Sequence, residues 1–251
     1  MPLKRLYPEP GETTPQELAA SLDLAGLAPD ARPYLVLNMV SSVDGKATYA
    51  GKTRGLSSEL DRALFHELRT RPDAVMVGAG TARVERYGRL VRREELRERR
   101  RATGLAPDPL AVIVSARLDL PADLPLLQDE ASRVVVATAS TENVEGVRAA
   151  VEYVRTGDDL PLLMALLREE HGVRSVLCEG GPTLNSHLLA AGLVDELFLY
   201  LSPGLLGGAD ALTIVAGRPL LEPVELEPVW LAEGDGGLFA RWRVRRPMGA
   251  G

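Results

Sequence analysis

Short apolar stretches of strand length alternate with helix-like patterns along most of this 251-residue chain. Alternation of this kind is typical of a largely parallel sheet with helices on both faces. The expected strands are residues 34–40, 74–77, 110–115, 133–138, 174–178 and 194–201. The expected helices are residues 142–150, 160–171 and 183–191, together with one that begins after Ser57 or Ser58 and has apolar positions at 60, 63, 64 and 68.

Two further apolar runs, residues 224–231 and 237–244, follow near the C-terminus and predict a closing antiparallel strand pair. The sheet should therefore be mixed, with an antiparallel edge. Residues 1–32 are rich in Pro and Ala, with a short helical stretch at 14–22, and we expect an N-terminal arm there. Because no repeat or long linker follows, residues 33–246 are predicted to form one domain, with 247–251 as a tail.

The composition narrows the class of protein. A hydrophobic content of 45% supports a full core, and a net charge of −6 gives no indication of a nucleic-acid partner. The single cysteine, Cys178, rules out a disulfide framework, and the three histidines show no metal-ligand spacing, so no metal site is expected. No apolar run is long enough to cross a membrane, and the first residues lack a signal-peptide pattern. We therefore expect a cytoplasmic protein with no membrane partner.

A strand that runs into a Gly-Gly turn and then a helix lies at residues 175–184. The apolar run ends at Glu179, Gly180 and Gly181 follow, and Pro182 opens the helix. Glycine lets the backbone approach a ligand closely, and a helix start offers free N–H groups to an anion. The pattern predicts a phosphate-binding turn, although a tight strand-to-helix connection without a ligand would have the same sequence.

A second turn of this kind follows the strand at 74–77, as Gly78-Ala79-Gly80-Thr81. Two such turns on one sheet could hold opposite ends of a dinucleotide. Neither is the fingerprint of a dinucleotide-binding Rossmann unit, because no G-x-G-x-x-G occurs with an acidic residue downstream. Two phosphate cradles and few acid–base groups suit hydride transfer, in which the cofactor carries the chemistry.

Residues 37–46 read as a strand that ends at an Asp-Gly turn, Asp44–Gly45. Such a dipeptide is ordinary turn chemistry, but it would also place Asn38 in a pocket and Asp44 at its rim. The charge run at 91–103 has two interpretations as well. It can be a solvated helix face with Glu–Arg pairs, or its first arginines can hold a substrate phosphate.

Together these motifs resemble the reductase domain of riboflavin biosynthesis, a pyrimidine reductase related in fold to dihydrofolate reductase. The resemblance spans residues 34–210. It implies a single-domain, dihydrofolate-reductase-like α/β fold with about eight or nine strands, NADPH as cofactor, and a homodimer. The matching pieces are Asn38, residues 42–46, Ser57, residues 68–69, 73–81, 179–184 and 192–197, Pro203 and residues 207–208.

The resemblance also implies residue roles. Asp44 and Glu179 are candidates for the acid that assists the reaction, and Glu179 would face the pyrimidine or the ribose. The cofactor would contact Val40, Ser57, Gly78, Gly80, Thr81, Ser115, Arg117, Gly180, Gly181, Pro182, Thr183 and Leu184. The substrate would contact Asn38, Thr53, Arg69 and Arg92 or Arg93. The implied reaction reduces the ribosylamino side chain of an aminopyrimidine 5′-phosphate to a ribitylamino side chain.

The chain departs from the family pattern in two places. After Thr81 the family usually shows an Asp-x-Pro-x-Leu turn, whereas residues 85–90 here are one residue longer and lack the proline. The deaminase domain that often precedes this reductase is also missing, so we expect a stand-alone reductase. Two alternatives stay open: a pterin or dihydrofolate reductase on the same fold, and a nucleotide-binding protein without turnover.

Overall fold

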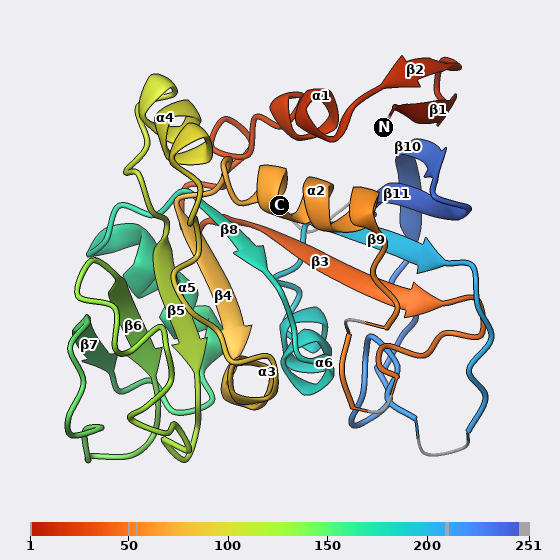
Figure 1. The fold of residues 1–251 in the computed structure, drawn as a ribbon. Helices are drawn as coiled ribbons and strands as arrows, with labels where there is room; N and C mark the ends of the chain where they lie inside the picture. The colour runs from red at the N-terminus through yellow and green to blue at the C-terminus, as the bar shows by residue number, and fades with distance from the viewer. Residues whose placement is uncertain (1, 50, 54, 209–210, 246–251) are drawn as a thin grey trace.

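The computed structural model describes residues 2–49, 51–53, 55–208 and 211–245 of the chain. In this part of the chain, eleven strands form one sheet in the order β2-β1-β10-β11-β9-β3-β8-β4-β5-β6-β7 (Figure 1). The strands are β1 (Leu3–Tyr7), β2 (Gly11–Thr13), β3 (Tyr34–Ser42), β4 (Ala74–Gly78), β5 (Leu110–Val114), β6 (Arg133–Ala137), β7 (Ala150–Val154), β8 (Ser175–Cys178), β9 (Glu196–Ser202), β10 (Leu226–Gly234) and β11 (Gly237–Val244). The helices are α1 (Pro15–Ala20), α2 (Glu59–Leu68), α3 (Ala79–Val84), α4 (Glu94–Ala102), α5 (Leu160–Glu169) and α6 (Pro182–Ala190).

The sheet is parallel from β9 to β7 and antiparallel from β9 to β2. The predicted mixed sheet with an antiparallel C-terminal edge is therefore confirmed. Each face carries its own apolar layer. On one face, α1 and α2 pack through Leu18, Leu60 and Leu64, and on the other, α5 and α6 pack through Leu163 and Leu188. Helices thus cover both faces, as the alternation of patterns predicts.

The N-terminal segment differs from the predicted arm. Its strand β1 pairs with β10 and with β2, so this segment extends the antiparallel edge of the sheet. Leu3 is 1% exposed and packs in the layer beneath α1 and α2. The sequence signal is weak because both strands are short and mostly polar. The predicted tail at 247–251 lies outside the described residues.

The helix predicted at residues 142–150 is wrong. The backbone there forms turns, and strand β7 begins at Ala150. Gly146 adopts a φ of 74°, which lies outside the helical region and is accessible mainly to glycine. Val144 and Val147 pack against the core from this irregular segment, so their apolar character reflects burial of a loop. No helix among the described residues is long and apolar enough to cross a membrane.

Candidate functional site

The two glycine turns lie side by side at the C-terminal ends of β4 and β8, which are parallel neighbours in the sheet. The N–H of Gly78 donates to the carbonyl oxygen of Gly180 over 2.7 Å. A Cβ atom on Gly181 would lie 2.6 Å from Oγ1 of Thr81, so the backbones approach each other closely. The turns thus form a single cradle, and the idea that they grip opposite ends of a dinucleotide is corrected. The Gly180–Gly181 peptide is cis.

Both helices that leave this cradle start without a side-chain cap. Gly78 is the N-cap of α3 and Gly181 is the N-cap of α6, and neither position has a side-chain hydrogen bond. Pro182 occupies the start of α6, and Thr183 and Leu184 complete its first turn. The first backbone N–H groups of a helix have no partner within the helix, so two uncapped starts side by side suit an anion. Figure 1 shows α3 and α6 next to each other at the ends of these strands.

Glu179 forms a buried ion pair with Arg69 directly beside the cradle. Arg69 donates through Nε and Nη2 to the two carboxylate oxygens of Glu179, each over 2.7 Å, and through Nη1 to the carbonyl of Leu90. The hydroxyl of Tyr87 donates to the same carboxylate over 2.7 Å. Burial alone would lower the pKa of Arg69, but the Glu179 carboxylate outweighs it and the pKa rises.

This arrangement corrects the expected role of Arg69. Arg69 is 8% exposed, and its Nε and Nη2 groups both bind the carboxylate of Glu179. These groups are therefore not available as the main ligand of a substrate phosphate. Its contact with Glu179 makes it a residue that positions the carboxylate. Tyr87 belongs to the altered loop at 85–90, and burial and then Glu179 raise its pKa well above the usual value. Tyr87 was missed because a lone tyrosine in a loop carries no sequence signal.

Asp44 anchors a loop. Its carboxylate accepts hydrogen bonds from the Ser42 hydroxyl over 2.5 Å and from the backbone N–H groups of Leu206 and Gly207. These bonds, led by the one from Ser42, lower the pKa of Asp44 to about 2. A carboxyl group that stays ionised at neutral pH cannot donate a proton there. The geometry thus favours the turn interpretation of Asp44 over its role as a catalytic acid.

Basic side chains gather beyond the end of α2. Arg92 is exposed and forms no ion pair with a described residue, while Arg93 comes only within 4.0 Å of Glu67. Burial, followed by the charges of Arg69, Arg93 and Arg92, lowers the pKa of His66. The sequence did not single out His66, although the charges of Arg92 and Arg93 act on its pKa.

Most of the predicted charge run is a solvated helix face. Arg97 and Arg101 both pair with Glu94 on α4, as the helical spacing suggests. Arg100 behaves differently, since it is fully buried and donates to the carbonyls of Arg69, Pro72 and Ala106. Neither interpretation of the run foresaw a buried arginine.

Four further predicted residues lie around the cradle. Ser115 is buried directly after β5, beside the Gly78 turn, and Arg117 is exposed two residues further on. Thr53 lies near the C-terminal end of α3, where its N–H and its hydroxyl both donate hydrogen bonds to Glu85. Val40 is half-buried near the end of β3.

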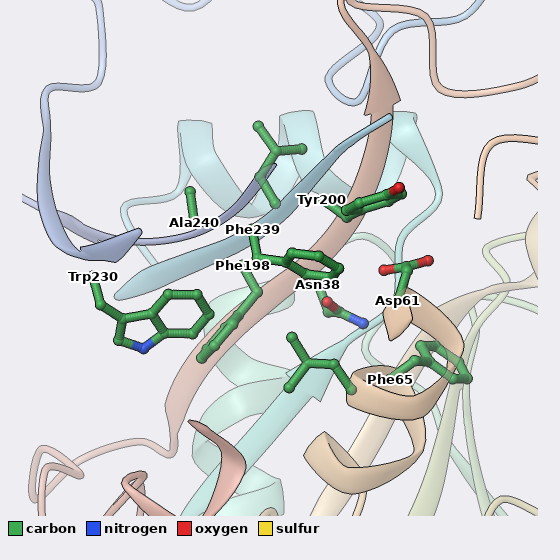
Figure 2. A pocket seen from close by; sticks show the side chains of 10 residues that line it. Asn38, Asp61, Phe65, Phe198, Tyr200, Trp230, Phe239 and Ala240 are labelled. Carbon is green, nitrogen blue, oxygen red and sulfur yellow. The ribbon is translucent and has the colours of Figure 1, made fainter. Parts of the chain in front are cut away.

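A carboxyl group that the sequence analysis did not name lies over the middle of β3. Ser57, a predicted cofactor contact, donates its hydroxyl to Oδ2 of Asp61 over 2.5 Å, and Asp61 lines a small pocket with Asn38 (Figure 2). Burial raises the pKa of Asp61 to about 6, against smaller opposing effects of Ser57 and Arg62. An acid in the first turn of a helix is ordinary, so the sequence gives no signal for it. The other residues that line the pocket are Leu64, Phe65, Phe198, Leu199, Tyr200, Trp230, Phe239 and Ala240.

The mixed sheet and the cradle at its strand ends define an α/β protein of the dihydrofolate-reductase-like class. Its fold matches a pyrimidine reductase-like protein from Corynebacterium diphtheriae with a TM-score of 0.72 and 24% identity, over 93% of this chain and all of that one. The chain belongs to the RibD C-terminal domain family, which matches residues 33–238.

Two curated relatives of similar length are named for the same reductase activity. The 2,5-diamino-6-ribosylamino-4(3H)-pyrimidinone 5′-phosphate reductase of Archaeoglobus fulgidus is 36% identical over 203 residues, which are 79% of this chain and 93% of that protein. The reductase of the same name from Methanothermobacter thermautotrophicus is 35% identical over 76% of this chain and 87% of the relative.

A longer structural neighbour carries a different substrate in its name. It is a deaminase and 5-amino-6-(5-phosphoribosylamino)uracil reductase from Thermotoga maritima, with a TM-score of 0.68 and 24% identity. The match covers 85% of this chain and 57% of that protein.

Proposed function

We propose that this chain is an NADPH-dependent reductase of riboflavin biosynthesis that converts the ribosylamino side chain of an aminopyrimidine 5′-phosphate into a ribitylamino side chain. Its membership of the RibD C-terminal domain family carries the proposal, since relatives matched over most of their length are named for this reaction. The direct test is NADPH consumption with the 2,5-diamino-6-ribosylamino-4(3H)-pyrimidinone 5′-phosphate. Binding of NADPH without its oxidation would favour the non-catalytic alternative.

The residues of the cradle fit a nicotinamide dinucleotide. Two uncapped helix starts and glycines without a Cβ leave space and N–H donors for a pyrophosphate. In our proposal Gly78, Gly80 and Thr81 hold it from one side, and the turn at 180–184 holds it from the other. Ser115 and Arg117 would then lie on the adenosine side, where the exposed guanidinium can pair with the 2′-phosphate. When bound, NADPH supplies the hydride that C1′ of the ring-opened imine form of the substrate accepts.

Replacing Gly181 with Ala should weaken NADPH binding at least about tenfold, or by about 1.4 kcal/mol. The added Cβ would lie 2.6 Å from Oγ1 of Thr81, so it must push the two turns apart where they form the cradle. The measurement is a fluorescence titration with NADPH. Gly11→Ala is the matched control, because a Cβ there meets no atom within 4 Å and the binding constant should not change. An unchanged affinity in Gly181→Ala would contradict the assignment.

For the substrate phosphate we propose Arg92 and Arg93, whose charges also act on His66. Arg92 is exposed and has no ion pair among the described residues, so its charge is available to a ligand. The guanidinium fork matches phosphate oxygens and keeps its charge at any working pH. Glu179, held by Arg69 and Tyr87, is proposed as the anchor for the ribose or the ring.

Replacing Arg92 with Ala should lower kcat/KM for the phosphorylated substrate by about 10- to 100-fold, because a charge-assisted hydrogen bond contributes about 1.5–3 kcal/mol. Steady-state kinetics with the phosphorylated and the dephosphorylated compound measure this. Arg101→Ala serves as the control, because Arg101 pairs with Glu94 on the exposed face of α4. This substitution should leave kcat/KM unchanged. If the wild-type protein turned over both compounds equally, the pterin alternative would be favoured.

We also propose a homodimer and a cytoplasmic location. The dimer is supported by the resemblance, and the location by the cysteine usage and charge of the sequence. Analytical ultracentrifugation tests the dimer, with an expected mass near twice the 27.0 kDa of the chain.

A further inference from the structure

Three side chains with metal-binding atoms meet where α5 ends beside β7, the last strand in the order of the sheet (Figure 1). A carboxylate oxygen of Glu152, a carboxylate oxygen of Glu170 and a ring nitrogen of His171 all lie within 4.8 Å of one another. Glu152 comes from the middle of β7, whereas Glu170 is the C-cap of α5 and His171 follows it directly. The fold therefore assembles a cluster that the spacing of the histidines along the chain did not reveal.

The ring of His171 is nearly buried, yet one of its nitrogens makes no hydrogen bond. The side chain is 10% exposed, and its Nε2 atom is buried without a hydrogen-bond partner among the described residues. A buried polar atom of this kind is costly, so it points to a ligand. Nε2 lies 3.5 Å from Oε1 of Glu152, which is longer than a good N–H···O hydrogen bond. The nitrogen thus faces the carboxylate across a gap.

The width of this gap fits a shared metal ion. Zn²⁺ binds a histidine nitrogen at about 2.0–2.1 Å and a carboxylate oxygen at about 2.0–2.2 Å, in tetrahedral geometry. Two ligand atoms at these distances and at the tetrahedral angle are about 3.3–3.5 Å apart. The 3.5 Å between Nε2 of His171 and Oε1 of Glu152 matches this separation. Glu170 is exposed, so its side chain is free to rotate and supply the third ligand.

The charges of the cluster also favour a cation. Glu152 and Glu170 are two carboxylates in close proximity, and neither forms an ion pair with an arginine or a lysine of the described residues. The C-terminal end of α5 adds the negative end of a helix dipole. Arg133, which lines the adjoining pocket with Glu152 and His171, is exposed and pairs with no described residue. A divalent ion would neutralise the repulsion between the two carboxylates.

We propose that Glu152, Glu170 and His171 bind a divalent transition-metal ion such as Zn²⁺, with water completing its coordination. The imidazole nitrogen selects this class of ion over Mg²⁺ and Ca²⁺, which prefer oxygen ligands. The adjoining pocket reaches Leu110 and Arg133, the first residues of β5 and β6, whereas the cradle lies beyond the last residues of β4 and β8. The ion therefore joins α5 to the edge strand β7 at the opposite end of the parallel strands, and its role is structural.

Calorimetric titration of the chelator-treated protein with Zn²⁺ tests the site. We expect one ion per chain, and Mg²⁺ should not compete for it. His171→Ala and Glu152→Gln should each weaken Zn²⁺ binding at least about tenfold, since even groups that only orient a metal ligand contribute about 10- to 100-fold. His187→Ala removes an exposed histidine of α6, and Glu169→Gln removes an exposed acid next to Glu170. Both are matched controls and should bind Zn²⁺ as the wild type does.

Urea unfolding with and without Zn²⁺ supplies a second measurement. The ion should raise the unfolding midpoint of the wild type and of both controls, because only the folded chain brings the three ligands together. The midpoint of Glu152→Gln should not respond, and this variant is expected to fold because the side chain is 56% exposed. Absence of Zn²⁺ binding, or binding that His171→Ala and Glu152→Gln leave unchanged, would overturn the site. Binding that the control variants weaken equally would indicate adventitious surface binding and would overturn it as well.

Discussion

Replacing Arg69 with Ala is expected to lower the free energy of unfolding by about 3–5 kcal/mol. The variant leaves the carboxylate of Glu179, which is 7% exposed, without either of its two charge-assisted bonds from the guanidinium. The Tyr87 hydroxyl alone cannot compensate, and the carbonyl of Leu90 also loses its donor. Urea unfolding at neutral pH, followed by circular dichroism, measures the loss.

The double variant Arg69→Met, Glu179→Gln separates charge burial from packing. It removes both ionised groups, so it should recover part of the stability that Arg69→Ala loses. Arg101→Ala on α4 breaks an exposed pair with Glu94 and should change the free energy of unfolding by less than about 1 kcal/mol. A loss below about 1 kcal/mol in Arg69→Ala would show that Glu179 finds other donors, and the positioning role of Arg69 would then be wrong.

Replacing Asp61 with Asn is expected to stabilise the ligand-free protein by about 1–2 kcal/mol at pH 7–8. The pKa of Asp61 rises from 3.8 to about 6 on folding, chiefly through burial, so the folded state holds this proton more tightly than the unfolded chain. About two units correspond to about 3 kcal/mol at most, and the partial exposure of the side chain reduces this. Chemical denaturation as a function of pH measures it.

The direction of the pKa shift decides the pH range in which the stabilities of wild type and Asp61→Asn differ. Below about pH 4 the carboxyl is protonated in both states, so wild type and Asp61→Asn should differ little there. The difference should grow between about pH 4 and pH 6, as the unfolded chain releases its proton first, and stay constant above that range. Arg62 lowers the pKa slightly, and the polar neighbours of Asp61 include Ser57, Ser58, Asn38 and Tyr200. A variant less stable than wild type at pH 8 would contradict this.

The parallel part of the sheet could be predicted because its strands are buried on both faces and its turns carry glycine. The helix predicted at 142–150 failed because burial of Val144 and Val147 in an irregular loop mimics a helical pattern, and the φ of Gly146 could not be read from the sequence. The N-terminal strands were missed because β2 pairs only with β1, and the partner of β1 on its other side, β10, lies more than two hundred residues further along the chain.

Within the site, motifs located the glycine turns but not the partners of the side chains around them. Arg69 carries the positive charge that a phosphate ligand needs. Only the fold shows that its guanidinium is already bound to the carboxylate of Glu179. Asp61 resembles any acid near a helix start, and its surroundings come from β3, β9 and β11. The roles of these side chains depend on contacts between segments that are distant in the chain. Such contacts cannot be read from a single sequence.

The hydrogen bond from Gly78 to Gly180 joins two segments about a hundred residues apart, and closing a loop of that length is slow and entropically costly. The cradle therefore exists only in molecules whose central strands have all docked. A partly folded intermediate lacks this cradle, so the dinucleotide that we propose as cofactor would bind only the finished fold and shift the population toward it. Cofactor concentration in the cell would then act on the lifetime of this protein as well as on its rate, and depletion of the nucleotide would expose it to proteolysis.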